Sequence, residues 1–252
     1  MNLPNPLVVL LHPISMLSFG MYAFLILIEA ILPARKLPEV KNWKVKGILS
    51  FIVFFYISVY LPMVLNPLLE PYRLFDLSGI GGAGGVAVGL LLLELAVYFW
   101  HRSLHRSNKL WRSFHQMHHS AERLDTYGTF FFSPLDMVGW TVIGSVCFSL
   151  LVGLSAEATT IIFMLNSFLN IFQHSNIRTP VWLGYIIQRP ESHTYHHAQK
   201  IHRHNYCDLP VIDMVFGTFH NPKTYEYETG FYHGASHRMA DMLMFRDVSV
   251  EE

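Results

Sequence analysis

The sequence has few charged residues and almost no cysteine. Of its 252 residues, 14% are charged and 52% are hydrophobic, and the formal net charge is +0. A soluble domain carries about 25% charged residues, so this composition is not typical of one. Because a neutral chain lacks the basic surface that binds the phosphates of a nucleic acid, we expect no nucleic-acid partner. The 2 cysteines, Cys147 and Cys207, are too few for a disulfide framework or a thiolate cluster.

The apolar residues gather in long runs. Three of these, residues 7–32, 47–65 and 80–100, contain very few ionisable side chains. A helix needs about 20 apolar residues to cross the ~30 Å hydrocarbon core of a bilayer, and each run is long enough. Two shorter runs, 138–154 and 159–172, are predicted to form a helical hairpin that either just spans the membrane or dips into it and returns. The opening "MNLPNP" has no basic segment, so we expect no cleaved signal peptide.

Basic residues in the connections predict an orientation. The connection at residues 33–46 carries five Lys and Arg, residues 66–79 carry only Arg73, and basic residues return after Trp100. Basic connections stay on the cytoplasmic side of a membrane. We therefore expect the first connection and everything that follows the third run, apart from the hairpin, to face the cytoplasm.

These patterns predict an all-α integral membrane protein with a single domain over residues 1–252. Three long spans and a helical hairpin would form a membrane base over about 7–172. A histidine-rich helical cap would lie on the cytoplasmic side, built from about 101–135 and 173–252.

The 15 histidines are unusually many, and most of them cluster. Three short segments, "HRSLH", "HQMHH" and "HTYHH", space them three or four residues apart, which places them on shared helix faces. The clustered histidines are His101, His105, His115, His118, His119, His193, His196 and His197.

Clusters of this kind predict a metal site. Eight imidazoles exceed the four ligands of tetrahedral zinc and suit two ions of higher coordination number. Imidazole binds iron, zinc, copper and nickel, so the ligand type alone does not identify the metal. A lone histidine is best explained as a hydrogen-bonded side chain, whereas three matched clusters beside apolar spans favour a metal or proton site.

The histidine segments and their surroundings resemble a known family. "YFWHRSLH", "HQMHH", "FQHSN", "QRPESHTYHH" and "HNYCDLPVIDMVFGTF" are similar to stretches of the fatty acid hydroxylase/sterol desaturase superfamily, in its bacterial type. The resemblance runs from about Leu92 to Val248.

The resemblance implies a centre of two iron ions held almost entirely by histidine. Such a centre would use O2 and two external electrons to hydroxylate or desaturate a C–H bond of a fatty acyl, sterol or related lipid. The resemblance assigns the eight clustered histidines as ligands, adds His174 of "FQHSN", and favours His204 over His202 as a further ligand. Asn170 stands where some members place another histidine.

The same resemblance implies partners and a location. Electrons would come from a separate carrier that is cytochrome b5-like, a ferredoxin or a reductase. The protein would be a multi-pass protein of a bacterial inner membrane, or of the endoplasmic reticulum in a eukaryote, with its active site on the cytoplasmic side.

Several polar residues near the clusters are candidates for roles in catalysis. Glu94 shares a helix face with His101 and would either orient that imidazole or form hydrogen bonds within the bundle. Asn205 belongs to the "NY" pair of the family. Glu191 and Asp213 are further candidates, and capping or ion pairing is the better explanation of Asp213.

Three other functions compete with a lipid oxygenase. A zinc-dependent membrane hydrolase needs a general base like the Glu of HExxH, which "HRSLH" lacks. A metal or proton transporter places its ionisable groups in the middle of the membrane. A haem protein needs two axial histidines and leaves the others unexplained. The sequence does not distinguish hydroxylation from desaturation.

Overall fold

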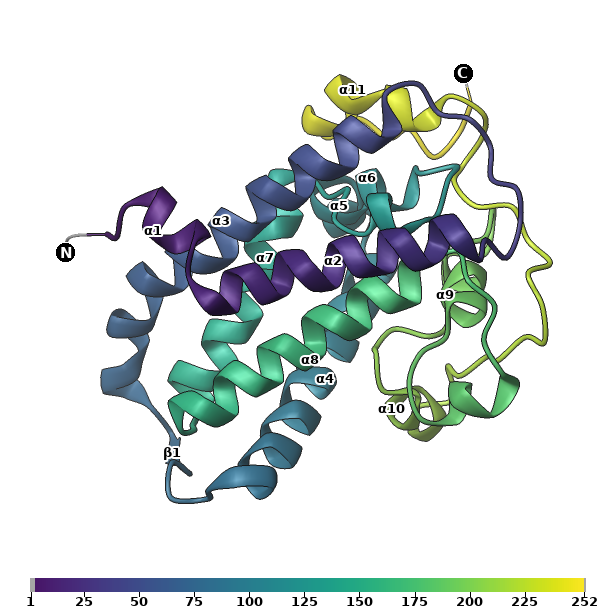
Figure 1. The fold of residues 1–252 in the computed structure, drawn as a ribbon. Helices are drawn as coiled ribbons and strands as arrows, with labels where there is room; N and C mark the ends of the chain where they lie inside the picture. Colours follow the sequence, from purple (N-terminus) through teal and green to yellow (C-terminus); the bar gives the residue numbers. More distant parts are fainter. Residues whose placement is uncertain (1–2, 252) are drawn as a thin grey trace.

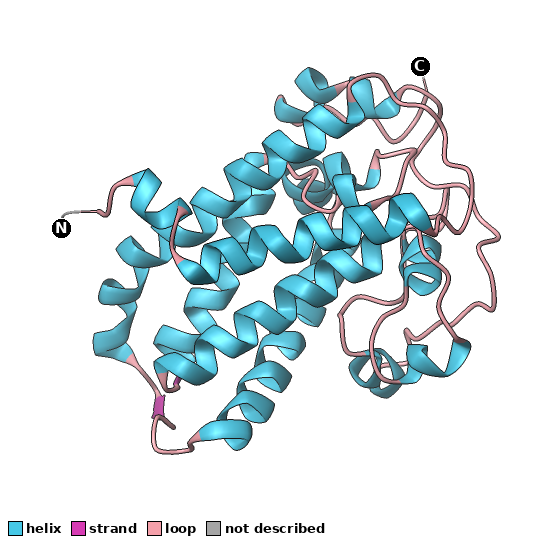
Figure 2. Cartoon of the chain, in the orientation of Figure 1, coloured by secondary structure: helices cyan, strands magenta, loops and turns pink. Residues whose placement is uncertain are grey.

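The computed structural model describes residues 3–251, and nearly all of its regular structure is helical (Figures 1 and 2). The long helices are α2 (Pro13–Ile31), α3 (Trp43–Leu69), α4 (Gly82–Arg106), α7 (Pro134–Ser145) and α8 (Ala156–His174). The short elements are α1 (Pro6–Leu10), η1 (Glu70–Tyr72), β1 (Phe75–Asp76), α5 (Asn108–Leu110), η2 (Trp111–His115), α6 (Gln116–His119), η3 (Thr126–Gly128), η4 (Val146–Leu151), β2 (Val152–Gly153), η5 (Val181–Tyr185), α9 (Pro190–His196), α10 (Pro210–Val215), η6 (Ala235–His237) and α11 (Met239–Leu243).

Four helical segments of the described chain are long and apolar enough to cross a membrane. They are Pro13–Ile31, Trp43–Tyr72, Gly82–Arg106 and Pro134–Leu151. The last of these is α7 extended by the π-helical segment η4, and α8 follows it as the second arm of the predicted hairpin. These elements confirm the helical membrane base with three long spans and a hairpin.

The first apolar run is not one helix, as the sequence had suggested. His12 caps α2 by accepting the main-chain N–H of Ile14 at Nδ1, 3.3 Å away, and Pro13 occupies the first helical position. Proline has no N–H to continue a preceding helix but fits the first turn of a new one. The run therefore divides into α1 and the longer α2.

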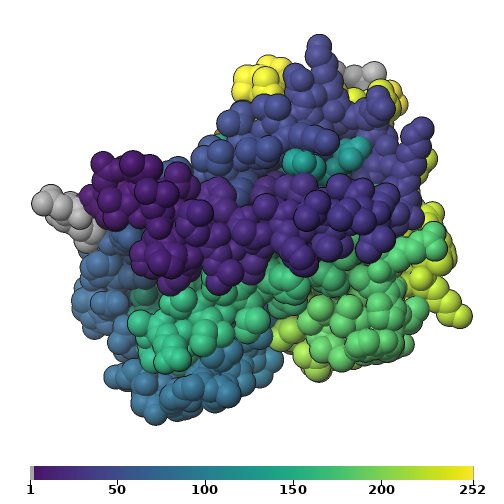
Figure 3. Space-filling model, in the orientation of Figure 1, coloured from purple at the N-terminus to yellow at the C-terminus, as the bar shows by residue number. Residues whose placement is uncertain are grey.

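The long helices pack in pairs around the base. α3 lies mainly against α7, α4 against α8, and α2 also lies against α8. Figure 3 shows α2 and α8 side by side along one face of the molecule. The close approach of α4 to α8 depends on Gly89, where a Cβ atom would lie 2.4 Å from the Cδ1 atom of Ile162.

The remaining residues, 107–133 and 175–251, form a cap at one end of the long helices. Two polar contacts attach it to the base. The buried Glu29 carboxylate of α2 accepts the main-chain N–H groups of Thr126 and Asn176, at 2.8 and 3.0 Å. The indole Nε1 of Trp43, at the start of α3, donates to Asp125 over 2.8 Å.

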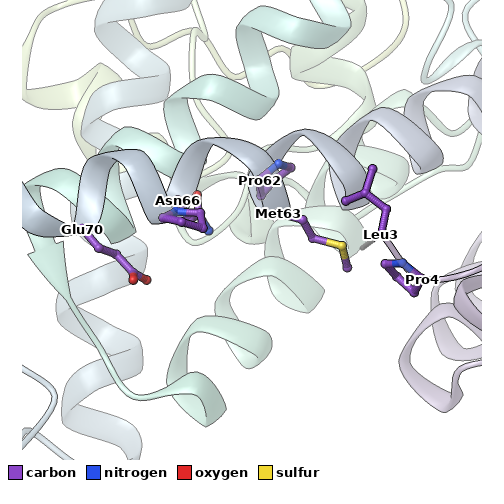
Figure 4. Close-up of a pocket in the computed structure, with 7 residues that line it drawn as sticks. Leu3, Pro4, Pro62, Met63, Asn66 and Glu70 are labelled. Carbon is purple, nitrogen blue, oxygen red and sulfur yellow. The ribbon is translucent and has the colours of Figure 1, made fainter. Parts of the chain in front are cut away.

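The opposite end of the helices is closed by a small sheet. β1 pairs in parallel with β2, Phe75 beside Val152, and Figure 1 shows this sheet far from α9, α10 and α11. An open pocket lies beside the last turns of α3, between Leu3 and Pro4 on one side and Met63 and Asn66 on the other (Figure 4). None of its lining residues is a histidine.

The separation of the two ends predicts how the protein labels in a membrane. Asp76 and Asn108 are both exposed, and they flank α4 at its two ends. A membrane-impermeant thiol reagent should therefore label Asp76→Cys and Asn108→Cys from opposite sides of sealed vesicles. The native Cys147 and Cys207 are buried and provide a low background. Labelling of both variants from one side would contradict α4 as a span.

Candidate metal centre

Nine histidines converge into two groups where α4 and α8 meet the cap. Within each group, one nitrogen from every imidazole lies within 4.8 Å of the others. Group 1 consists of His101, His105, His115, His119 and His196. Group 2 consists of His118, His174, His193 and His197.

The two HxxHH segments divide their histidines between the groups in a reciprocal way. In "HQMHH", His115 and His119 join group 1 while His118 joins group 2. In "HTYHH", His193 and His197 join group 2, and the remaining histidine, His196, joins group 1. Residues four apart share a helix face, whereas adjacent residues point about 100° apart. Each doublet therefore bridges the two groups.

Local backbone structure places these segments. His101 and His105 occupy the last turns of α4, which runs on from the third apolar run to Arg106. Ser107 then caps the next helical segment by accepting the N–H of Leu110, and the π-helical turn η2 ends at His115. Single π-helical turns are rare and are frequent at functional sites. This π-helical turn changes the position of His115 relative to the α-helical turn that carries His118 and His119.

Four of the imidazoles have Nδ1 against an oxygen that can only accept a hydrogen bond. The pairs are His101 with the carbonyl of Tyr206 at 2.8 Å, His174 with that of Asn170 at 2.7 Å, His196 with that of His204 at 2.6 Å, and His115 with the Asp136 carboxylate at 2.8 Å. Such an acceptor fixes the ring proton on Nδ1 and leaves a lone pair on Nε2, as in many metal sites.

The Nε2 atoms face one another at short range. The distance is 3.0 Å from His101 to His115, 3.1 Å from His119 to His196, and 3.0 Å from His174 to His193. His101 and His115 both carry their proton on Nδ1, so two lone pairs confront each other. A shared proton would relieve one such pair, but five nitrogens converge in group 1. A metal ion satisfies them all at once, and the donor set therefore fits one.

Burial keeps the imidazoles of the cap in the form that binds metal. It lowers the pKa of His118, His119, His193, His196 and His197 well below the ordinary 6.5, and neighbouring histidines lower it further. These rings are therefore neutral at pH 7, with a lone pair available as a ligand.

The structure does not bring His204 into either group, so its assignment as a further ligand in preference to His202 stays a prediction. The ring of His204 lies beside Tyr195 and His220, and only its carbonyl reaches the centre, through His196. His202 is the closer of the two, with its Nδ1 3.1 Å from that of His119. The main chain is responsible, since both residues have positive φ angles that turn the loop.

The polar candidates also lie away from the ligand nitrogens. The Glu94 carboxylate accepts the main-chain N–H of Asp208 at 2.8 Å, and none of its hydrogen bonds within the described chain goes to His101. Asn170 donates its amide to Asp208 and orients His174 through its carbonyl. Asn205 bonds the main chain of Ser192 and His220, so it holds the loop together.

Other candidates have structural roles. Glu191 accepts from Thr179 at 2.9 Å and pairs with Arg189 at 3.2 Å, which anchors the start of α9. Asp213 accepts the N–H groups of Tyr206 and Cys207 at 2.9 and 3.2 Å, so it holds the loop before α10 rather than capping that helix.

Two groups that contact the centre were missed in the sequence. Asp136 orients His115 from the first turn of α7, and Gln188 contacts Nδ1 of His193 at 3.1 Å. A lone acid at the start of an apolar run was a signal for the first. Nothing in the sequence distinguished Gln188, because its contact with His193 depends on how the turn that leads into α9 folds.

Comparison with known proteins agrees with this geometry. A family model described as "Fatty acid hydroxylase" matches residues 86–218, a range that includes both groups. No solved structure matches the chain.

Several curated proteins are similar to the chain. Ornithine lipid hydroxylase OlsE of Rhizobium tropici is 32% identical over 142 residues, covering 54% of this chain and 42% of that protein. Delta(7)-sterol-C5(6)-desaturase of Nicotiana tabacum is 26% identical, covering 60% and 55%. Sphinganine C4-monooxygenase 1 of Arabidopsis thaliana is 22% identical, covering 71% of each chain. The chain spans about half the length of the first two relatives.

The reciprocal arrangement predicts how metal content responds to substitution. His118→Ala or His193→Ala leaves three imidazoles in group 2, so the purified chain should retain about one ion instead of about two. His237→Ala, which changes an exposed histidine outside both groups, should retain about two. Elemental analysis of the three variants in one detergent decides this. Equal metal content in all three would contradict the assignment of group 2.

Acid should destabilise the metal-free protein. The imidazoles of the cap have lowered pKa values when folded, so the unfolded chain binds more protons once the pH falls below about 6.5. Stability is then fully present above that pH and is lost progressively below it. The melting temperature of the chelator-treated protein, followed from about pH 8 to about pH 5, measures the effect. A melting temperature that rises as the pH falls would refute it.

Proposed function

The chain belongs to the fatty acid hydroxylase family, and we propose that it is a membrane-bound di-iron oxygenase that hydroxylates or desaturates a lipid. The supporting observation is the pair of converging imidazole groups, with the lone pairs of His101 and His115 set 3.0 Å apart. Group 1 would hold one iron ion and group 2 the other. Neither group includes a carboxylate, so both ions would keep most of their positive charge.

Iron is the metal that this reaction needs. When bound, it supplies the redox chemistry that reduces O2 to an oxidant able to take hydrogen from an unactivated C–H bond, which no side chain can do. In hydroxylation, the lipid, O2, two electrons and two protons yield the alcohol and one water. In desaturation, the same reactants yield the alkene and two waters.

The chain's own residues would hold, orient and shield the centre. Asp136 and the carbonyls of Tyr206, Asn170 and His204 fix the ring orientations. Because their protons stay on Nδ1, each Nε2 atom remains available.

Aromatic rings cover the centre on the side of the base. The Phe132 ring lies 4.5 Å from that of His118, and the Trp140 ring of α7 lies 5.6 Å from that of His101. Such rings exclude water, which would otherwise consume the oxidant. A lipid chain can approach from this side without leaving an apolar environment.

The competing functions explain less of the arrangement. A zinc hydrolase needs three protein ligands and a general base, whereas group 1 offers five imidazoles. A haem protein would use two histidines and leave seven of the nine without a role. A transporter would place its groups in mid-membrane, whereas these lie where α4 and α8 end.

We assign the protein to a multi-pass location in a bacterial inner membrane, or the endoplasmic reticulum of a eukaryote, with the centre on the cytoplasmic side. The basic connection before α3 supports that side. Electrons would come from a cytochrome b5-like protein, a ferredoxin or a reductase that docks on the cap.

Labelling with 18O2 tests the proposal and separates its two chemistries. Cells that express the chain should accumulate a lipid that has gained one 18O atom if it is hydroxylated, or lost two hydrogens without 18O if it is desaturated. His119→Ala should abolish the new lipid because group 1 loses a ligand, whereas His237→Ala should not. Lipid mass spectrometry is the measurement. A lipidome unchanged by expression, with iron present in the protein, would refute the activity.

A further inference from the structure

A chain of buried side chains connects group 2 to a carboxyl group in the loop before α10. Nδ1 of His193 lies 3.1 Å from the amide nitrogen of Gln188, and this amide also contacts the amide oxygen of Gln173. The amide nitrogen of Gln173 in turn lies 2.8 Å from Oδ1 of Asp208. All four side chains are buried, and the main-chain N–H of Gln188 donates to the carbonyl of Asp208 at 2.8 Å.

Asp208 sits in an environment of amides and one other acid. Its Oδ2 accepts from Asn166 and Asn170, each at 3.0 Å, and the same Asn166 amide also reaches Oε1 of Glu94 at 3.5 Å, so the two carboxyl groups are neighbours. In the described part of the chain, none of the hydrogen bonds to these two carboxyl groups comes from lysine or arginine. Two neighbouring buried carboxyl groups without a basic partner repel when both are ionised, which favours a proton on one of them.

The metal imposes a requirement on His193. Its Nε2 lies 3.0 Å from that of His174 and 3.1 Å from that of His197, so this atom faces group 2. A neutral imidazole that binds through Nε2 carries its proton on Nδ1. That N–H group needs a hydrogen-bond acceptor, and the group beside it is the side-chain amide of Gln188. Metal binding therefore requires the amide oxygen of Gln188 to face His193, which a half-turn of the amide provides.

The same requirement determines the orientation of each further side chain between Gln188 and Asp208. When the amide oxygen of Gln188 faces His193, the same oxygen also faces Gln173. The side-chain NH2 of Gln173 must then donate to it. The amide oxygen of Gln173 then faces Oδ1 of Asp208 at the 2.8 Å contact. Two acceptors at this distance repel unless one of them carries a proton, and only the carboxyl group can take one.

We propose that Asp208 is a positioning residue whose protonated carboxyl group, acting through Gln173 and Gln188, fixes the proton of His193 on Nδ1 and so presents its Nε2 to the metal. This inference rests on the metal centre of the proposed function. Glu94 complements Asp208, because its Oε2 accepts two main-chain N–H groups, from Asp208 and Leu209.

The electrostatic surroundings favour the same protonation. Burial raises the pKa of Asp208 well above its ordinary value and the neighbouring Glu94 raises it further, whereas the amide hydrogen bonds from Gln173 and Asn166 lower it by less. The other ionisable groups near the pair are Asp213 of α10 and the thiol of Cys207, and an acid or thiol favours a neutral Asp208.

Zinc binding by the full chain in detergent tests the proposal, since zinc fills histidine sites without redox chemistry. Asp208→Asn keeps a hydrogen-bond donor for Gln173 and should bind the second zinc ion as the unaltered protein does. Asp208→Leu removes the donor and should weaken that ion by about tenfold or more, as loss of a partner behind a ligand does. Gln188→Leu should weaken it similarly, whereas Gln188→Glu offers His193 an acceptor and should not.

Infrared spectroscopy supplies a second readout. The zinc-loaded protein should show the carbonyl stretch of a neutral carboxylic acid, and this band should persist in Glu94→Gln and disappear in Asp208→Asn. Retention of the first zinc ion, in group 1, reports that each variant is folded. If Asp208→Leu fails to fold, zinc binding by Asp208→Asn and the infrared band still test the proposal.

The outcomes separate this inference from the function on which it rests. An unaltered protein that binds no second zinc ion would contradict the metal centre itself. A second ion that binds normally to the unaltered protein but weakly to Asp208→Asn would show that Asp208 acts as an ionised acceptor, which overturns the inference. Absence of the acid band from the zinc-loaded protein would overturn it as well.

Discussion

Nine imidazoles, eight of them buried, set their nitrogen lone pairs against one another unless a cation lies between them, and the rest of the molecule is arranged around this constraint. The apolar base removes water, which would otherwise solvate the lone pairs. Short loops of the cap then supply main-chain carbonyls at Nδ1, as at His101 and His196. The same loops are fixed by Asn205 and Asp213, so residues remote from the converging nitrogens determine where the imidazoles point.

The cap and the base therefore both contribute residues to one candidate site. α4 is at once a span and the source of His101 and His105. α8 carries a row of amides, at Asn166, Asn170 and Gln173, that lowers its apolar character and faces Asp208. Polar groups inside a membrane bundle are costly and persist where they serve a function. Here they provide hydrogen-bond partners for a buried carboxyl group.

Regular spacing made much of the architecture and most of the two histidine groups predictable from the sequence. Hydrophobic runs indicated the spans, and the i, i+3, i+4 pattern indicated eight of the nine histidines in the two groups, while the family resemblance added His174. The features that were not predicted have one physical origin. The position of His204 outside both groups and the oxygens behind the rings were not foreseen, because main-chain acceptors and positive φ angles have no side-chain signature. The division of the first run at Pro13 was readable but was outweighed by hydrophobicity.

The histidine doublets have a consequence for how the centre fills. His118 and His119 are neighbours on one short helix, yet they belong to different groups, and His196 and His197 do the same at the end of another. In a centre of two ions, the first ion to bind would therefore immobilise backbone that the second ion also needs. The entropy of ordering both segments would be lost only once, which would favour binding of the second ion without any contact between the ions.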